Sequence, residues 1–164
     1  MTEEISKALN SAQDSENSQK DLYLTFHLNG ENYGLEIGHV IEITGIQRIT
    51  SVPDLPDYLK GVVNMRGLVI PVMDIRLRFG MSERASDERT CMIFVRFDNN
   101  TVGLLVDRVN DVTEIPVGKI EPPPRTGANQ ACFIKGMGKS ESTVNILLDT
   151  KELLTFGRLP AVVE

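Results

Sequence analysis

The sequence predicts a mainly β fold built from two small, pseudo-repeated β-barrel subdomains, followed by a short C-terminal helix. Three observations support this prediction: apolar residues alternate with polar ones along several short segments, a stretch of about seventy residues occurs twice, and helical periodicity is scarce. Period-two alternation is typical of strands. Two copies of this length suit two small barrels, because a solenoid needs more repeats.

Residues 1–20 are expected to form a disordered tail. They are rich in Ser, Asn, Gln and Glu and contain few apolar side chains, so they cannot bury enough surface to offset the entropy lost on folding. We expect order from Asp21 onward, with residues 21–164 forming a single domain in which two barrel subdomains are intertwined.

The first ordered segment predicts a β-hairpin. Apolar residues occupy alternate positions from Leu22 to Leu28 and again from Tyr33 to Ile37. The sequence between these runs includes Asn29-Gly30, and both residue types adopt positive φ at low cost, as a tight hairpin turn requires.

A second hairpin of the same kind follows. The apolar run Cys91 to Phe97 is separated from the alternating run Val102 to Val106 by the turn residues Asp98-Asn99-Asn100. An offset of 69 residues superimposes the two hairpins in apolar phase and turn, and it also aligns Gly34 with Gly103.

The duplication continues beyond the hairpins. An offset of 75 residues aligns residues 58–61 with residues 133–136, and Asp74 with Asp149. The additional residues fall in the proline-rich stretch around Pro122-Pro123-Pro124. Self-similarity at a nearly fixed offset indicates a duplicated structural unit.

Short helical segments are expected beside the strands. We predict a turn within Ile37 to Ile43, another within Asp74 to Phe79, and a C-terminal helix over Thr150 to Phe156. Asp149 or Thr150 would cap the last helix, and Gly157 would end it, because glycine tolerates the conformation that terminates helices.

Charge and hydropathy argue against nucleic acid and against membrane insertion. The 164-residue chain has 17 basic and 23 acidic side chains and a net charge of −6, which opposes binding to polyanions. No cationic leader precedes an apolar run, and no segment approaches the roughly 20 apolar residues of a membrane span. We therefore expect a cytoplasmic protein.

The cysteines and histidines do not predict a metal site. Cys91 and Cys132 lie among apolar neighbours, and in a reducing compartment they are expected to be core thiols. Together with His27 and His39 they lack the paired short spacings of a zinc site. No metal and no cofactor is predicted.

Motifs that resemble catalytic sites fail on spacing. Gly138-Lys139-Ser140 imitates the end of a phosphate-binding loop, but the glycine needed five positions earlier is Phe133. No serine has a glycine both two residues before it and two residues after it, as the nucleophile of a serine hydrolase would require. We predict no catalytic residue. A small nucleotide-binding enzyme that uses Gly136 to Ser140 stays as the alternative from another functional class.

A polar turn at residues 64–67 lies between two strongly apolar arms and predicts a hairpin with Arg66 at its tip. In the second copy, Lys139 stands opposite Asn64 and Glu141 opposite Arg66, whereas framework positions are kept. This divergence permits a specific binding role for the first copy. The alternative is that Asn64 and Gly67 only form the turn and that Arg66 is solvated.

The same segment resembles the signature of a known family. Lys60 to Phe79, with its Gly-Val-Val-Asn-Met-Arg-Gly, Pro-Val and Asp-Ile-Arg elements, is similar to the corresponding part of CheW-type chemotaxis coupling proteins. Tyr33 to Ile37 with Val40 and Glu42 resembles the first hairpin of that family, and Val102 to Val112 resembles its counterpart in the second subdomain. The resemblance covers nearly the whole ordered chain.

The resemblance implies two SH3-like five-stranded β-barrels that share a hydrophobic interface. It also implies a function, because CheW-type adaptors couple the cytoplasmic tips of methyl-accepting chemoreceptors to the regulatory domain of the histidine kinase CheA in membrane-associated arrays, without catalysis. Within the same class, the alternatives are a CheV-type protein and a kinase regulatory domain. We expect the short chain to disfavour both, since each needs further segments.

The resemblance also implies two sets of contact residues. Positions associated with receptor contact are Glu42, Asn64, Arg66, Val109 and Val112, and positions associated with kinase contact are Val40 and Gly61. A groove lined by Val109 and Val112 can receive the apolar stripe of a helical receptor tip while Arg66 pairs with an acidic side chain at its rim. Alternatively, both valines are core residues and Gly61 is a backbone requirement.

Overall fold

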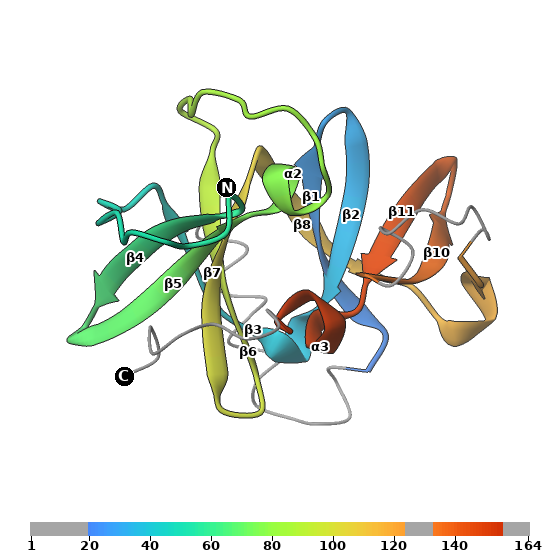
Figure 1. The fold of residues 1–164 in the computed structure, drawn as a ribbon. Coiled ribbons are helices and arrows are strands. Elements are labelled where there is room, and N and C mark those ends of the chain that lie inside the picture. The colour runs from blue at the N-terminus through green and yellow to red at the C-terminus, as the bar shows by residue number, and fades with distance from the viewer. Residues whose placement is uncertain (1–19, 124–132, 156–164) are drawn as a thin grey trace.

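The computed structural model describes residues 20–123 and 133–155, which form two β-sheets packed against each other (Figure 1). The six-stranded sheet has the order β8-β1-β2-β11-β10-β9, and the five-stranded sheet has the order β3-β6-β7-β5-β4. The predicted mainly β fold is confirmed. The predicted tail, apart from Lys20, lies outside the described residues, as do Cys132, Phe156 and Gly157.

The strands of the six-stranded sheet come from both ends of the described chain. They are β1 (Leu22–Leu28), β2 (Glu31–Glu36), β8 (Arg108–Glu114), β9 (Ile120–Glu121), β10 (Ile134–Ser140) and β11 (Thr143–Leu148). The five-stranded sheet is continuous in sequence. Its strands are β3 (Val40–Gly45), β4 (Leu59–Met65), β5 (Leu68–Asp74), β6 (Cys91–Phe97) and β7 (Asn100–Val106).

Both predicted hairpins are confirmed. Strands β1 and β2 pair antiparallel from Tyr23–Glu36 to Leu28–Glu31, and Asn29 and Gly30 form the turn with φ of 53° and 84°. Positive φ at both turn residues matches the right-handed twist of the paired strands. Strands β6 and β7 pair in the same way.

The two copies of the repeat exchange strands between the sheets. The β1–β2 hairpin of the first copy pairs with β8 and β11 of the second, while the β6–β7 hairpin of the second copy pairs with β3 and β5 of the first. Two parallel pairings, β2 with β11 and β5 with β7, complete this exchange. The copies differ at one edge, where the two-residue strand β9 corresponds to a single bridge between Thr50 and Val62.

The largest core cluster lies between the sheets, and a smaller cluster lies on the other side of each sheet. Leu24, Phe26 and Leu28 of β1 join the central cluster, whereas Tyr23 belongs to the small cluster of the six-stranded sheet. Strand β6 likewise divides its side chains between the central cluster and a second small cluster. Strands β1 and β6 are therefore buried on both faces over most of their length, although His27 is half-buried and Arg96 is exposed.

Short helices follow the last strand of each copy. Asp74 caps α2 (Ile75–Arg78), where its Oδ1 accepts from the Leu77 amide at 3.4 Å, and Asp149 caps α3 (Thr150–Leu153). The helix predicted within Asp74 to Phe79 is confirmed, whereas the C-terminal helix begins at Thr150 as predicted but ends at Leu153, before the predicted end at Phe156. The predicted turn after Ile37 is only the 3₁₀ helix η1 (Ile37–His39), because the chain then enters strand β3. A second 3₁₀ helix, η2 (Val117–Lys119), precedes β9. None of the described helices has the length and apolar character needed to span a bilayer.

Candidate interaction surface

The β4–β5 hairpin carries the predicted Arg66 at its tip. Arg66 and Gly67 form the turn, with φ of 53° and 86°. Asn64 stabilises this turn, since its Oδ1 accepts a hydrogen bond from the Gly67 amide at 2.9 Å. The Arg66 side chain is 80% exposed, so the fold holds its backbone while leaving the guanidinium accessible.

Arg66 forms an ion pair with Glu42, another of the predicted contact residues. Nη1 of Arg66 lies 3.1 Å from Oε1 of Glu42, and Nη2 donates to Oε2 at 3.3 Å. Glu42 is on β3 and Arg66 follows β4, although these strands are the opposite edges of the five-stranded sheet. The sheet therefore curls until its edges approach. An exposed pair of this kind contributes only about 0–1 kcal/mol, so its main effect is to position the two charges.

Two exposed apolar residues lie beside Arg66 at the start of β5. Leu68 is 67% exposed and Val69 is 65% exposed, and Val69 is the cross-strand partner of Asn64. We call Glu42, Asn64, Arg66, Leu68 and Val69 the hairpin-tip surface. In the sequence, Leu68 and Val69 stand out only as part of an apolar arm. Their position directly after the turn could have indicated their exposure, because the end of a long hairpin extends beyond the core.

Val109 and Val112 lie apart from this surface in the sheet topology, on edge strand β8 of the other sheet. Val109 pairs with Phe26, is 4% exposed and belongs to the central cluster. It is a core residue in the isolated chain, so the expectation that its side chain lines an open groove is not met. Val112 is half-buried against the central cluster, as is its repeat counterpart Ile43.

Val40 and Gly61, the positions predicted for kinase contact, are both buried. Val40 is 1% exposed and packs in the central cluster. Gly61 lies where the β4–β5 register shifts, with φ of 146°, and a Cβ placed there would lie 2.1 Å from the Thr50 carbonyl oxygen. The backbone thus requires glycine at this position, which agrees with the alternative given for it above.

A buried ionic cluster that was not predicted from the sequence is centred on Asp107, between β7 and β8. Nε and Nη2 of Arg76 on α2 donate to the two carboxylate oxygens at 2.8 and 2.7 Å, and the Asn29 amide donates to Oδ2 at 3.0 Å. Arg84 lies 3.2 Å from the same oxygen. Asp107 therefore joins the turn of the first hairpin to α2 and to the loop that follows it.

Electrostatics keep Asp107 ionised. Burial raises the pKa of its carboxyl group, but hydrogen bonds from Arg76 and Asn29 and the charges of Arg76 and Arg84 outweigh burial, so the pKa lies below its usual value. The hydrogen bond to Asp107 in turn raises the pKa of Arg76. Reciprocal shifts of this kind are typical of a paired buried carboxylate and guanidinium.

Cys91 and the residues of the loop-like motif, Gly138 to Ser140, lie within β-strands. Gly138 and Lys139 lie within β10, paired with Asn145 and Val144, and not in a loop that opens a helix. Cys91 is half-buried, and burial raises the pKa of its thiol. Within residues 20–123 and 133–155, no three metal-ligating side chains gather.

The fold and its exposed hairpin tip define a β-rich interaction module. A family model described as the CheW-like domain matches residues 22–157. The chain therefore belongs to the CheW-like family.

Relatives with known names agree with this family. The chain is 35% identical to the chemotaxis protein CheW of Klebsiella aerogenes over 81% of each chain, and 35% identical to the CheW of Bacillus subtilis over 80% of this chain and 85% of that protein. The crystal structure of the scaffolding protein TtCheW from Thermoanaerobacter tengcongensis matches with a TM-score of 0.77 and 31% identity, covering 88% of this chain and 97% of TtCheW.

Proposed function

We propose that this chain is a chemotaxis adaptor that couples transmembrane chemoreceptors to the histidine kinase CheA. The proposal is supported by its membership of the CheW-like family and by the names of its relatives, which are chemotaxis proteins and, for TtCheW, a scaffolding protein. In this role the chain works in the cytoplasm, is recruited to membrane-associated arrays by its partners, and catalyses no reaction itself.

The hairpin-tip surface is the proposed contact for the cytoplasmic receptor tip. The observation that carries this assignment is the exposed Arg66 guanidinium beside the exposed Leu68 and Val69. Exposed apolar side chains next to an oriented charge are typical of a partner-binding surface. The apolar stripe of a receptor helix would pack on Leu68 and Val69, while an acidic receptor side chain would compete with Glu42 for Arg66.

The kinase regulatory domain is the second proposed partner. Val40 and Gly61 are buried, so they would act by shaping the edge strands β3 and β4 that the kinase contacts. Val112, being half-buried, is proposed as a secondary receptor contact, whereas Val109 would support β8 from within the core.

Arg66→Glu should weaken binding to a receptor-tip fragment at least about tenfold, a loss of about 1.4 kcal/mol. The carboxylate introduced at position 66 would repel both Glu42 and an acidic receptor side chain. The melting temperature should stay nearly unchanged, because the side chain is 80% exposed. Calorimetric titration measures the affinity. Lys119→Glu, the same charge reversal on exposed η2 beside the other sheet, should bind like the original chain.

The double variant Glu42→Arg/Arg66→Glu separates direct contact from internal support. It reverses the ion pair without removing it. If Arg66 contacts the receptor, binding stays weak in the double variant. Full recovery of affinity would contradict direct contact and leave Arg66 as a partner of Glu42 only.

A further inference from the structure

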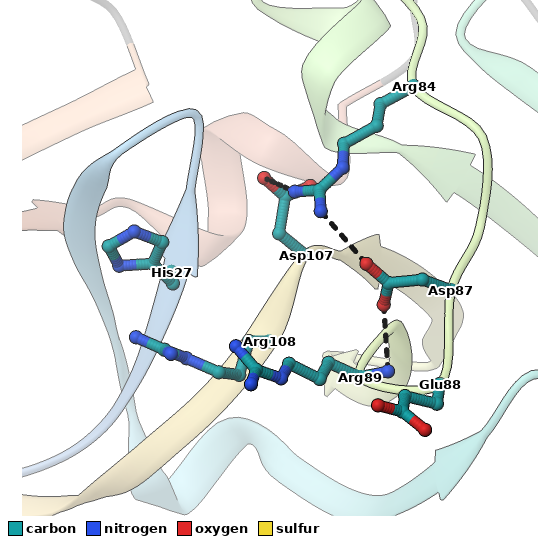
Figure 2. Close-up of a pocket in the computed structure, with 7 residues that line it drawn as sticks. All are labelled: His27, Arg84, Asp87, Glu88, Arg89, Asp107 and Arg108. Atoms are coloured by element: carbon teal, nitrogen blue, oxygen red, sulfur yellow. Dashed lines mark hydrogen bonds and ion pairs between the residues drawn. The ribbon is translucent and has the colours of Figure 1, made fainter.

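A polar pocket of about 420 Å³ lies where β1, the β7–β8 junction and the loop after α2 meet (Figure 2). The residues that line it are His27, Arg84, Asp87, Glu88, Arg89, Asp107 and Arg108. None of the positions assigned above to receptor or kinase contact lines this pocket.

Two of the three lining carboxylates are already engaged. Asp107 accepts from Arg76 and from the Asn29 amide and pairs with Arg84. Oδ1 of Asp87 accepts from the amides of Arg89 and Thr90, and its Oδ2 pairs with Arg84 at 2.8 Å. These contacts neutralise Arg84 and fix the loop that carries Arg89.

Two guanidinium groups of the pocket are left without an acidic partner. In the part of the chain that the structure describes, neither Arg89 nor Arg108 has a carboxylate within ion-pair distance. Figure 2 shows the Arg89 side chain running from its loop toward Arg108 on β8, with Glu88 at the lower end of the loop. Arg89 from the loop and Arg108 from β8 thus bring two cationic groups together, against one lining carboxylate, Glu88, that has no cationic partner among the described residues. The surplus of positive charge favours an anion.

His27 lies beside Arg108 on the wall that strands β1 and β8 form. It is the register partner of Arg108 in the β1–β8 pair. Its Nδ1 lies 3.2 Å from Oδ1 of Asn32, and this oxygen also accepts from Nδ2 of Asn110 at 3.1 Å. Nδ1 of His27 is therefore the donor in this contact, which fixes the ring. In the neutral imidazole Nε2 is then an acceptor, which suits a hydroxyl group of a ligand and not its anionic oxygens.

We infer that this pocket binds the phosphate group of a small phosphorylated molecule. Guanidinium groups match phosphate oxygens with paired hydrogen bonds, and a phosphate monoester carries about two negative charges at neutral pH. Arg89 and Arg108 would hold these charges, and Nε2 of His27 would accept from a hydroxyl group of the organic part. The pocket volume lies within the range of small-molecule sites. Because all its lining side chains are polar, the organic part of the ligand is polar as well, as in glycerol phosphate.

The test is a calorimetric titration of the full chain with glycerol 3-phosphate, inorganic phosphate and glutarate at about 50 mM ionic strength, where screening is weak. We expect saturable binding of glycerol 3-phosphate. Arg89→Gln/Arg108→Gln should weaken it at least about tenfold. Arg96→Gln, an exposed arginine on β6 outside the pocket lining, should change it less than about twofold. If the double variant melts at a lower temperature than the original chain, the single variant Arg89→Gln, on an exposed loop, tests the loss of binding instead.

The ligands separate the possible anions. Binding of glycerol 3-phosphate tighter than inorganic phosphate supports a phosphorylated small molecule, whereas equal affinities would assign the site to free phosphate and overturn the inference of an organic ligand. No saturation, equal affinity for glutarate, or the same loss in Arg96→Gln would overturn the phosphate site itself. The inference does not depend on the adaptor function, because the titration uses the chain without receptor or kinase.

Discussion

Asp107→Ala is expected to lower the free energy of unfolding by about 3–5 kcal/mol, the usual cost of removing one partner of a buried ion pair. The change leaves Arg76, only 12% exposed, without its carboxylate. It also removes the acceptor of the Asn29 amide and one partner of Arg84. Denaturation in urea measures the effect as a lower transition midpoint with an unchanged slope.

Two further variants control this result. Asp57→Ala, at an exposed position, should change stability by less than about 0.5 kcal/mol. Arg76→Ala/Asp107→Ala should cost less than the sum of its two single changes, because the double variant leaves neither charge buried alone. Asp107→Ala with the same midpoint as Asp57→Ala would contradict the role assigned to the ionic cluster.

Gly61→Ala is expected to lower the free energy of unfolding by about 3 kcal/mol or more. The backbone φ of 146° is one that side chains with a Cβ rarely adopt, and the new methyl group would lie 2.1 Å from the Thr50 carbonyl oxygen. That oxygen accepts from the Val62 amide at 2.9 Å, so it cannot move without losing a hydrogen bond. Backbone strain alone costs about 1–3 kcal/mol, and the steric clash adds to it.

Gly45→Ala is the matched control for Gly61. Gly45 lies at the end of β3 without positive φ, and no neighbouring atom lies within 4 Å of its added Cβ. We expect its melting curve to match that of the original chain. If Gly61→Ala also melts like the original chain but loses kinase binding, Gly61 is a contact residue and the backbone explanation is wrong.

Much of the fold could be predicted from the sequence because short-range signals determined it. Apolar runs separated by turn residues located both hairpins, and the similarity of the hairpins then indicated the repeat. Intertwined subdomains were expected, but which hairpin joins which sheet was not visible in the sequence, because a repeat offset identifies equivalent strands and not the strands they pair with. The turn predicted within Ile37 to Ile43 included the start of strand β3 (Val40–Gly45), because Val40-Ile41-Glu42-Ile43 shows no clear alternation of apolar and polar residues.

The candidate site was less predictable, since contact and burial depend on tertiary structure. The tip position of Arg66 followed from its polar turn, but its pairing with Glu42 depends on the curvature that brings opposite sheet edges together. Val109 fits an apolar repeat phase whether it is buried or exposed, and only the packing shows that it is buried. The Asp107 cluster joins residues 29, 76, 84 and 107, a set that no spacing rule connects.

The most direct test of the proposed adaptor function is the mass of the complex formed when the chain is mixed with a receptor-tip fragment and the regulatory domain of CheA. Size-exclusion chromatography with light scattering measures this mass. The account predicts one complex that contains all three components, and loss of the receptor fragment from it when Arg66→Glu replaces the original chain. Elution of the chain alone, bound to neither partner, would contradict the function proposed here.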